Sequence, residues 1–540
     1  MKVVEGNIID PIARTIKKGK VFFNKKIVKI EYTNQIQSTN YILPGFVDAH
    51  VHIESSMLTP LEYSKIALKH GVVSAVTDPH EIANVCGIEG IYFMVDNAKM
   101  TPMKIYFGAP SCVPATDFET SGSIISAADI EILFLNNICS HLSEMMNYPG
   151  LIYDDVNVHK KLDVAKKYSK RIDGHAPMLS GADLEKYVKA GISTDHECTN
   201  LLEAIEKINL GMKIMLRNSS ASKDFDTLID LISSHPNDIM FCTDDCHPDD
   251  LLQGYINLLV STSFAKGYDL FDVLLASTKN AIDHYGLDVG FLQLNDNADF
   301  IVINTLDNFK ILSTFINGDE VYDGCRVNID ASKDQIVNQF FTNSIVETDI
   351  RVKTNGDRFS VIEIIPDSLL TNKSIFETNA NHEFLEVDLP NDILKVVVLN
   401  RYKPAKPAIG FIKGYGLKAG AIAGTIAHDS HNIIAVGVSD EAIIRVISKL
   451  QQIEGGLVVY DGVDIYSLAL PVAGLMSTND CETVAYEYST LSERVNELGS
   501  PLKAPFMTLA FMSLLVIPSL KIGDKGLFDV DKFQFIDLQN

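Results

Sequence analysis

Two histidines, His50 and His52, stand one residue apart at the end of the apolar run 41–47. If this run is a β-strand, residues i and i+2 share one face, so both imidazoles point the same way. Imidazole nitrogens are common ligands of zinc, iron and similar ions. A His-x-His pair also arises by chance, and the alternative is two ordinary histidines at a strand edge. The pair therefore predicts a metal site only if further ligands follow.

The elements that must position such ligands form a repeated strand–helix pattern from residue 43 to about 265. Segments with helical spacing, such as 60–69, 158–168 and 251–264, lie between strand-like apolar runs. With the run before His50 there are eight, the others being 72–77, 104–109, 138–144, 171–175, 191–196, 213–217 and 239–243. Eight alternating units predict an α/β fold with a (β/α)8 TIM-type barrel, whose active site lies at the C-terminal ends of its strands.

The two flanks of this pattern differ from it. Short strands and turns before residue 43 predict a small β domain. Residues 346–540 combine β-rich runs with glycine-rich turns, which predicts an additional C-terminal α+β domain. A chain of 540 residues is too long for one ordinary core, in agreement with several domains.

Several stretches resemble a known family. The run Leu43-Pro44-Gly45-Phe46-Val47-Asp48-Ala49-His50 is similar to the first barrel strand of the amidohydrolase superfamily. The stretches 52–58, 78–84, 143–147 and 428–432 resemble the adenine deaminase family within it. The resemblance covers nearly the whole chain. It implies a composite β-sandwich from residues 1–43 and 285–345, a barrel with a metal site at 44–284, and a family-type domain at 346–540.

The resemblance also implies a two-metal site with ligands at successive strand ends. These ligands are His50, His52, Glu144, His175, His196 and Asp244. Many relatives place a carbamylated lysine where this chain offers Glu144, which is therefore expected to bridge the ions. His141, three residues earlier, is expected on the opposite face of the strand. Taken alone, each histidine could be structural and Asp244 could be a helix N-cap. Six residues of metal-binding types, placed in order at the ends of successive strands, favour the metal site.

The implied reaction is the hydrolysis of adenine to hypoxanthine and ammonia in purine salvage. Two divalent ions roughly 3.5–4 Å apart share a hydroxide that attacks C6, and Asp244 passes its proton to the leaving group. Mn(II) or Fe(II) is expected, and Zn(II) suits the same ligands. Asp244, Glu144 and Glu197 are the expected catalytic residues. Glu197 acts on a ring nitrogen only if the chain turns after His196, and Asp245 is expected to point away.

Further polar residues are expected to bind the substrate. They are Glu81, Arg217, His428, Asp429, His431 and Asn432. The last four lie between two apolar runs and are expected to close over the purine. The simpler alternatives are a helix start at 78–81, an ion pair for Arg217 and a plain β-turn at 428–432.

Composition limits the partners. A net charge of −24 argues against nucleic acid and anionic membranes, and is compatible with adenine and water. Eight cysteines without a C-x-x-C pair, and no apolar signal segment, favour the cytoplasm. We expect a homo-oligomer, a dimer or larger. The alternatives are another amidohydrolase acting on a different aminopurine or cyclic amide, and a non-catalytic amidohydrolase-like binding protein.

Overall fold

The computed structural model describes residues 1–220, 223–329, 336–366, 368–377 and 382–539, so parts of the predicted segments 285–345 and 346–540 lie outside it. The chain divides into two compact units. Unit 1 comprises residues 1–80, 92–111 and 126–334, and unit 2 comprises 81–91, 112–125 and 335–540. Two segments from the middle of the predicted barrel, 81–91 and 112–125, thus pack with the C-terminal part of the chain.

Unit 1 contains a five-stranded and a three-stranded parallel sheet. The first has the order β5-β6-β7-β8-β9 and the second β10-β11-β12. Isolated parallel bridges pair Ile172 with Ile192 and Val51 with Asp244. The strands are β5 (Phe46–Val51), β6 (Val72–Thr77), β7 (Lys104–Ala109), β8 (His141–Met145), β9 (Ile172–Gly174), β10 (Thr194–Asp195), β11 (Lys213–Arg217) and β12 (Ile239–Cys242).

All eight predicted runs contain a strand, and three have the predicted bounds. β5 and β6 are buried along their whole length, as expected for parallel strands covered on both faces. The run 138–144 was predicted too early, because the strand begins at His141. Asn137 has a left-handed backbone (φ 53°), and the Ile138 N–H donates to the Leu133 carbonyl, so these residues end the preceding helix instead.

The helices between the strands agree in part with the prediction. Helix α1 (Pro60–Lys69) has the predicted bounds. The segment 251–264 is two helices, α10 (Pro248–Gln253) and α11 (Ile256–Ala265), because Gly254 and Tyr255 between them have non-helical backbone angles. Among the described residues, every helix is too short or too polar to cross a bilayer.

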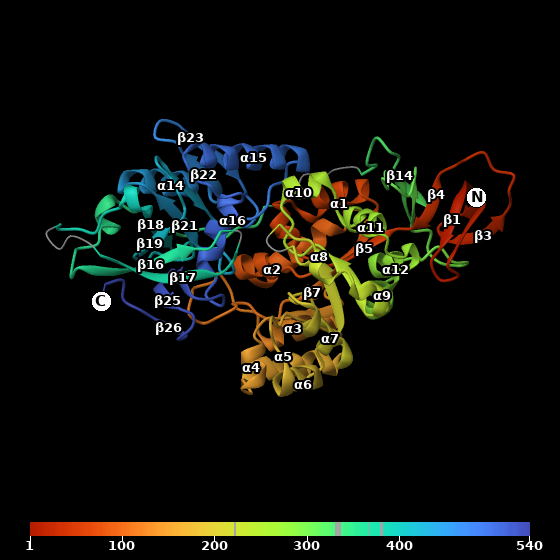
Figure 1. Cartoon of the computed structure of the whole chain (residues 1–540), viewed down its shortest axis with the longest axis horizontal. Coiled ribbons are helices and arrows are strands. Elements are labelled where there is room, and N and C mark those ends of the chain that lie inside the picture. Colours follow the sequence, from red (N-terminus) through yellow and green to blue (C-terminus); the bar gives the residue numbers. More distant parts are fainter. Residues whose placement is uncertain (221–222, 330–335, 367, 378–381, 540) are drawn as a thin grey trace. The chain divides into compact units, whose positions relative to one another are not determined.

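A seven-stranded sheet joins the two ends of unit 1. Strands far apart in the sequence lie side by side in it (Figure 1), because β4 pairs with both β1 and β13. Phe23, Phe300 and Phe315 form its aromatic core, with ring centroids 4.6–5.5 Å apart. Its strands are β1 (Lys2–Asp10), β2 (Thr15–Phe23), β3 (Ile27–Tyr32), β4 (Tyr41–Pro44), β13 (Phe300–Ile303), β14 (Ile311–Ile316) and β15 (Asp319–Tyr322).

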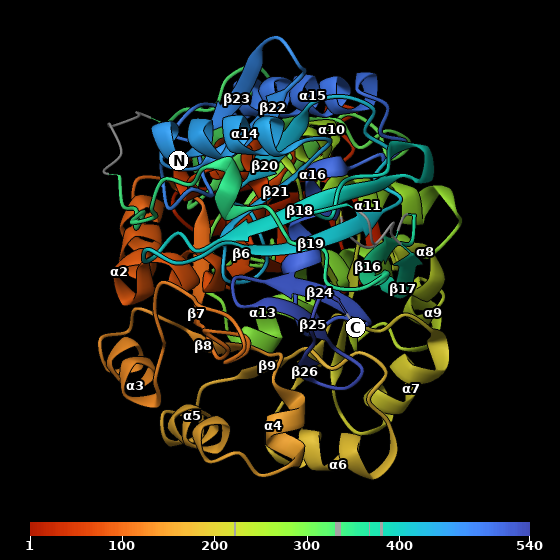
Figure 2. The same cartoon turned by 90° about the vertical axis from the view of Figure 1, so that its left-hand side faces the viewer.

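Unit 2 is built on a mixed eight-stranded sheet. Helix α14 (Asp440–Ile453) covers β20 and β22, and α15 (Cys481–Glu497) packs on β22 and β23 (Figure 2). Ile443, Val446, Ile447 and Leu450 of α14 have helical spacing and are buried in the unit's core. In sheet order the strands are β17 (Thr371–Glu377), β16 (Arg358–Ile364), β19 (Ala408–Lys413), β18 (Ile393–Leu399), β21 (Ile433–Gly437), β20 (Ala421–Gly424), β22 (Gly456–Tyr460) and β23 (Ile465–Ala469).

Candidate metal centre

The strand ends of unit 1 bring all six predicted ligand side chains together. His50 and Glu144 lie on β5 and β8, and His52, His175, His196 and Asp244 follow β5, β9, β10 and β12 within two residues. Five of the six side chains are at most 7% exposed, and His175 is 26% exposed. The group therefore sits where water is largely excluded and fixed charges act strongly.

Glu144 is shared by two overlapping sets of possible ligands. Its Oε1 lies 3.3 Å from His52 Nε2, while its Oε2 lies 2.8 Å from His175 Nδ1 and 3.2 Å from His196 Nε2. In the set of His50, His52 and Glu144, and in that of Glu144, His175 and His196, the ligand atoms lie within 4.8 Å of one another. A carboxylate with one oxygen toward each set has the geometry of a bridge.

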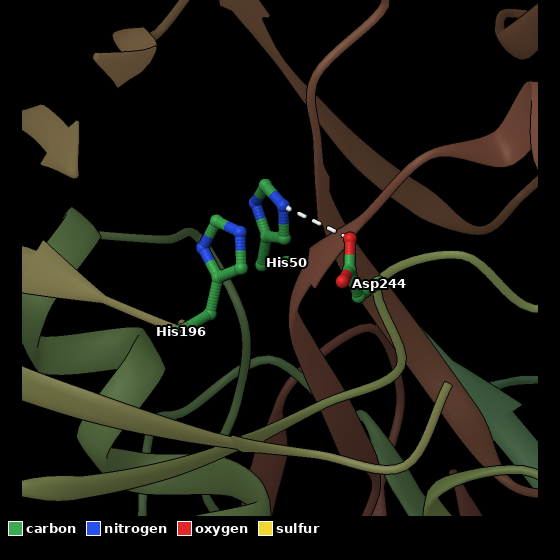
Figure 3. A group of neighbouring side chains, drawn as sticks. All are labelled: His50, His196 and Asp244. Carbon is green, nitrogen blue, oxygen red and sulfur yellow. Dashed lines mark ion pairs between the residues drawn. The ribbon is translucent and has the colours of Figure 1, made fainter. Parts of the chain in front are cut away.

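Asp244 completes the group from β12. Its Oδ1 lies 3.2 Å from His52 Nε2 and 3.7 Å from His50 Nε2. Figure 3 shows His50 beside His196, with Asp244 facing His50; the two rings are stacked with centroids 4.2 Å apart. The Nε2 atoms of His50 and His52 are 3.2 Å apart, close to the separation of two ligands on one tetrahedral ion, about 3.3 Å.

The charges of this group favour a cation. Burial raises the pKa of Asp244, but the His52 hydrogen bond and the Arg217 charge lower it well below its usual range. Burial likewise opposes ionisation of Glu144, yet His175 and the other histidines hold its pKa well below normal. In turn burial lowers the pKa of His52, but both carboxylates raise it well above normal. Two ionised carboxylates thus attract positive charge to this point, which protonated histidines or divalent ions can supply.

Surrounding hydrogen bonds orient the ligands. The Nδ1 of His52 is 3.1 Å from the Asp78 carbonyl, which leaves Nε2 directed toward Asp244 and Glu144. The buried Asp48 carboxylate accepts hydrogen bonds from the His50 N–H at 3.1 Å, the Tyr255 hydroxyl at 2.5 Å and the Thr243 hydroxyl. Asp48 therefore ties β5 to the residue before Asp244. Sequence reasoning missed this role, although Asp48 lies within the recognised motif.

Arg217 links the expected catalytic carboxylates. Its guanidinium donates to Asp244 Oδ2 at 2.9 Å, to Asp224 Oδ2 at 3.1 Å and to both carboxylate oxygens of Glu197. Glu197 Oε1 also lies 3.5 Å from His196 Nε2, because β10 ends at Asp195 and the chain has turned by this point. The ion-pair alternative for Arg217 is therefore observed, and Glu197 joins the group.

Asp245 departs from the prediction. It was expected to point away, but ligand atoms of His52, Asp244 and Asp245 lie within 4.8 Å of one another. Asp244 has a left-handed backbone (φ 57°), so the alternation of an extended strand ends there. The Asp245 carboxylate accepts a hydrogen bond from the Ser55 hydroxyl at 2.5 Å.

Two further histidines of unit 1 are buried, and one of them, His80, contacts Glu144. His141 is buried, and its Nε2 lies 3.4 Å from Asp173 Oδ2. His80, at the start of α2 (His80–Ala98), has its Nδ1 3.5 Å from Glu144 Oε1 and 3.4 Å from Asp78 Oδ2. A cavity of about 140 Å³ lined by Ser219, Thr243 and Tyr255, among others, has none of the six ligands in its described wall, so we do not assign the substrate to it.

In unit 2 the remaining predicted residues form a polar group. Residues 425–432 connect the antiparallel strands β20 and β21, and His428, Asp429, His431 and Asn432 are all buried there. Glu81, which also belongs to unit 2, lies 3.6 Å from His428 Nδ1. The Asn432 side chain makes two hydrogen bonds within unit 2: its amide N–H donates to the Thr120 carbonyl, and its oxygen accepts from the Arg401 backbone N–H.

Comparisons with known proteins cover both units. The model of the amidohydrolase family matches residues 41–321, and that of the adenine deaminase C-terminal domain matches 368–534. An adenine deaminase of Methanosarcina mazei is 47% identical, covering 100% of this chain and 99% of the relative. One of Borreliella burgdorferi is 43% identical, covering 99% of each. The crystal structure of a beta-aspartyl dipeptidase from Fervidobacterium islandicum is 16% identical, covers 61% of this chain and 100% of that one, and has a TM-score of 0.47.

Proposed function

The chain belongs to the adenine deaminase family of the amidohydrolases, and we propose that it hydrolyses adenine to hypoxanthine and ammonia. The observation that carries this is similarity over the whole length, including the C-terminal domain, together with a set of six ligand-type side chains, five of them buried. The reaction consumes one water and releases the C6 amino group as ammonia.

The donor set fits a pair of divalent ions, with Glu144 shared between them. We assign His50, His52 and Asp244 to one ion, and His175 and His196 to the other. When bound, such a pair lowers the pKa of water toward neutrality and supplies a nucleophile. Nitrogen and carboxylate ligands suit Mn(II), Fe(II) and Zn(II) alike, so the metal is not fixed by the ligands.

Asp244 and Glu197 are the proposed proton carriers. Asp244 takes the proton of the attacking water and gives it to the departing amino group, which leaves as ammonia only when protonated. Glu197 serves the ring nitrogen next to C6. Arg217 contacts both carboxylates and holds them in one relative position. This support is geometric: a bidentate guanidinium fixes orientation as well as charge.

Substrate binding is proposed for the six residues expected from the sequence. Arg217 belongs to unit 1, and Glu81, His428, Asp429, His431 and Asn432 belong to unit 2. Unpaired polar groups left by a wrong base would supply discrimination. Glu81, His428 and His431 are close enough together to act as one group.

We also propose that the eight parallel strands close as a (β/α)8 barrel. The bridges at Ile172–Ile192 and Val51–Asp244, which link the two parallel sheets at both edges, support this. The seven-stranded sheet supports the composite sandwich at 1–43 and 285–345. A cytoplasmic location and a homo-oligomeric state remain proposals from the sequence.

An ammonia-release assay over a purine and pyrimidine panel, with manganese supplied, tests the proposed function. We expect adenine to give equal amounts of hypoxanthine and ammonia. Release from a different aminopurine or a cyclic amide, with adenine inert, would favour another amidohydrolase activity. Metal-loaded protein that binds adenine without turnover would favour a binding protein.

A further inference from the structure

Unit 2 contains a second group of ligand-type side chains, separate from the six of unit 1. Glu81, His428 and His431 each offer one ligand atom within 4.8 Å of the other two. His428 Nδ1 lies 3.6 Å from Glu81 Oε1, and His431 Nε2 lies 3.9 Å from Glu81 Oε2. All three residues are buried: His428 is 8% exposed, His431 0% and Glu81 1%. The group joins residues some 350 positions apart in the sequence, because segment 81–91 packs in unit 2.

These separations match ligands arranged around an ion better than direct hydrogen bonds. Both exceed the roughly 2.7–3.2 Å of an N–H···O hydrogen bond. Ligands about 2.0–2.1 Å from a tetrahedral ion are about 3.3–3.4 Å from one another. Small rotations of the Glu81 side chain would close the remaining few tenths of an ångström. Two imidazoles and one carboxylate are also the protein ligands of many catalytic zinc sites.

The surroundings are negative and poorly hydrated. Asp429, 4% exposed, has its Oδ1 3.7 Å from His428 Nδ1 and is a possible fourth ligand. Burial and the charge of Asp429 raise the pKa of Glu119 well above normal. The negative charge of Asp429 would attract a divalent ion placed between Glu81 and the two imidazoles.

The His428 imidazole is held in place by stacking, whereas the His431 imidazole has a competing hydrogen bond. The Phe511 ring stacks on His428, with centroids 4.6 Å apart and planes at 16°. The Ala427 N–H donates to His431 Nδ1 at 3.3 Å. This hydrogen bond favours the tautomer with its proton on Nε2, in which Nε2 cannot bind an ion. Ion binding at Nε2 requires the proton on Nδ1 and the loss of this long contact. The competing state is thus a hydrogen-bonded His–Glu–His cluster that takes no metal.

We propose that Glu81, His428 and His431 bind one divalent cation of the zinc or manganese class, in addition to the pair in unit 1. The proposal does not rest on adenine being the substrate. It gives three of the proposed substrate-binding residues a common role, which is to act through the ion. Asp429 contributes charge and a possible ligand oxygen.

Metal counting on the full chain tests this. Apoprotein is saturated with Zn(II), freed of excess metal, and analysed by elemental mass spectrometry. Wild type should hold about three ions per chain, and Glu81→Gln, which preserves size, about two. His431→Gln and His428→Gln should also lose one ion. His382→Gln, an exposed unit 2 histidine whose side chain is 51% exposed, should keep wild-type content.

A double variant keeps the test decisive if the single changes disturb folding. In His52→Gln/His196→Gln, one imidazole is removed from each of the two unit 1 ligand sets, and Co(II) should still give the visible absorption of one tetrahedral ion that disappears when Glu81→Gln is added. Wild-type protein with only two ions, or unchanged content in all three unit 2 variants, would overturn the proposal. Adenine turnover is measured separately, so loss of deaminase activity with three ions bound would refute the proposed function and leave this site standing.

Discussion

Replacing Asp244 by asparagine should separate the chemistry of this carboxylate from its place in the structure. The side chain keeps its size, but only one of its two polar atoms is still an oxygen. In the wild type, Oδ2 is 2.9 Å from Arg217 and Oδ1 is 3.2 Å from His52, so the asparagine oxygen can face only one of these two partners. An amide does not accept a proton at neutral pH. The variant therefore loses proton transfer while the neighbouring backbone stays as it is.

The expected loss in kcat is about 10²- to 10⁴-fold, the usual contribution of a positioned acid–base group. This corresponds to about 2.7–5.4 kcal/mol in the activation barrier. Whichever way the amide turns, one of its two contacts is broken. That loss, about 1–3 kcal/mol, should appear mainly in metal affinity or stability.

The assay is hypoxanthine formation, with rates normalised to the measured metal content of each preparation. Asp245→Asn is the matched control, because Asp245 is the next residue and its ligand atom also lies near His52. We expect Asp245→Asn to lower kcat by less than about tenfold, since the Asp245 carboxylate accepts a hydrogen bond from the Ser55 hydroxyl. A loss below tenfold for Asp244→Asn, or a larger loss for Asp245→Asn, would refute the assignment.

Three further predictions concern other residues. Glu144→Ala should lower metal content and abolish turnover, because it removes the oxygens shared by both ligand sets; elemental analysis showing full occupancy would contradict this. Arg217→Met should destabilise unit 1 by about 3–5 kcal/mol in urea unfolding, since the buried carboxylates lose their partner. Arg217→Lys should restore only part of that stability, because an ammonium group cannot form the paired hydrogen bonds of a guanidinium. Burial lowers the pKa of Lys521 to about 7 from 10.5, so the unfolded chain binds more protons between these values. Wild-type stability should therefore rise with pH from about 7 to 10 relative to Lys521→Met, by up to about 1.4 kcal/mol per pH unit, and a constant difference would argue against a neutral buried lysine.

The parts of the fold that follow from local pattern were predictable from the sequence. β6, β7 and β11 have the predicted bounds because each is a largely apolar run with clear ends. The order of the six ligand-type residues followed from the same pattern and the family motifs. The structure brings all six into one group, of which five are buried.

Features that depend on single backbone angles or on distant packing were not predictable. The left-handed backbone of Asp244 turns Asp245 toward His52, and Gly254 divides one predicted helix into two. Neither residue type requires these angles. The packing of segments 81–91 and 112–125 into unit 2 depends on contacts with residues hundreds of positions away, so no local signal near Glu81 indicates its histidine partners.

The most direct test of the central claim measures metal content and adenine turnover on the same preparation. Apoprotein should be inactive, and stepwise addition of Mn(II) should restore hypoxanthine and ammonia formation together, with activity complete once the unit 1 pair is filled. Glu144→Ala should show no such recovery at any manganese concentration. Full adenine turnover by metal-free protein, or manganese-dependent recovery in Glu144→Ala equal to wild type, would contradict the account.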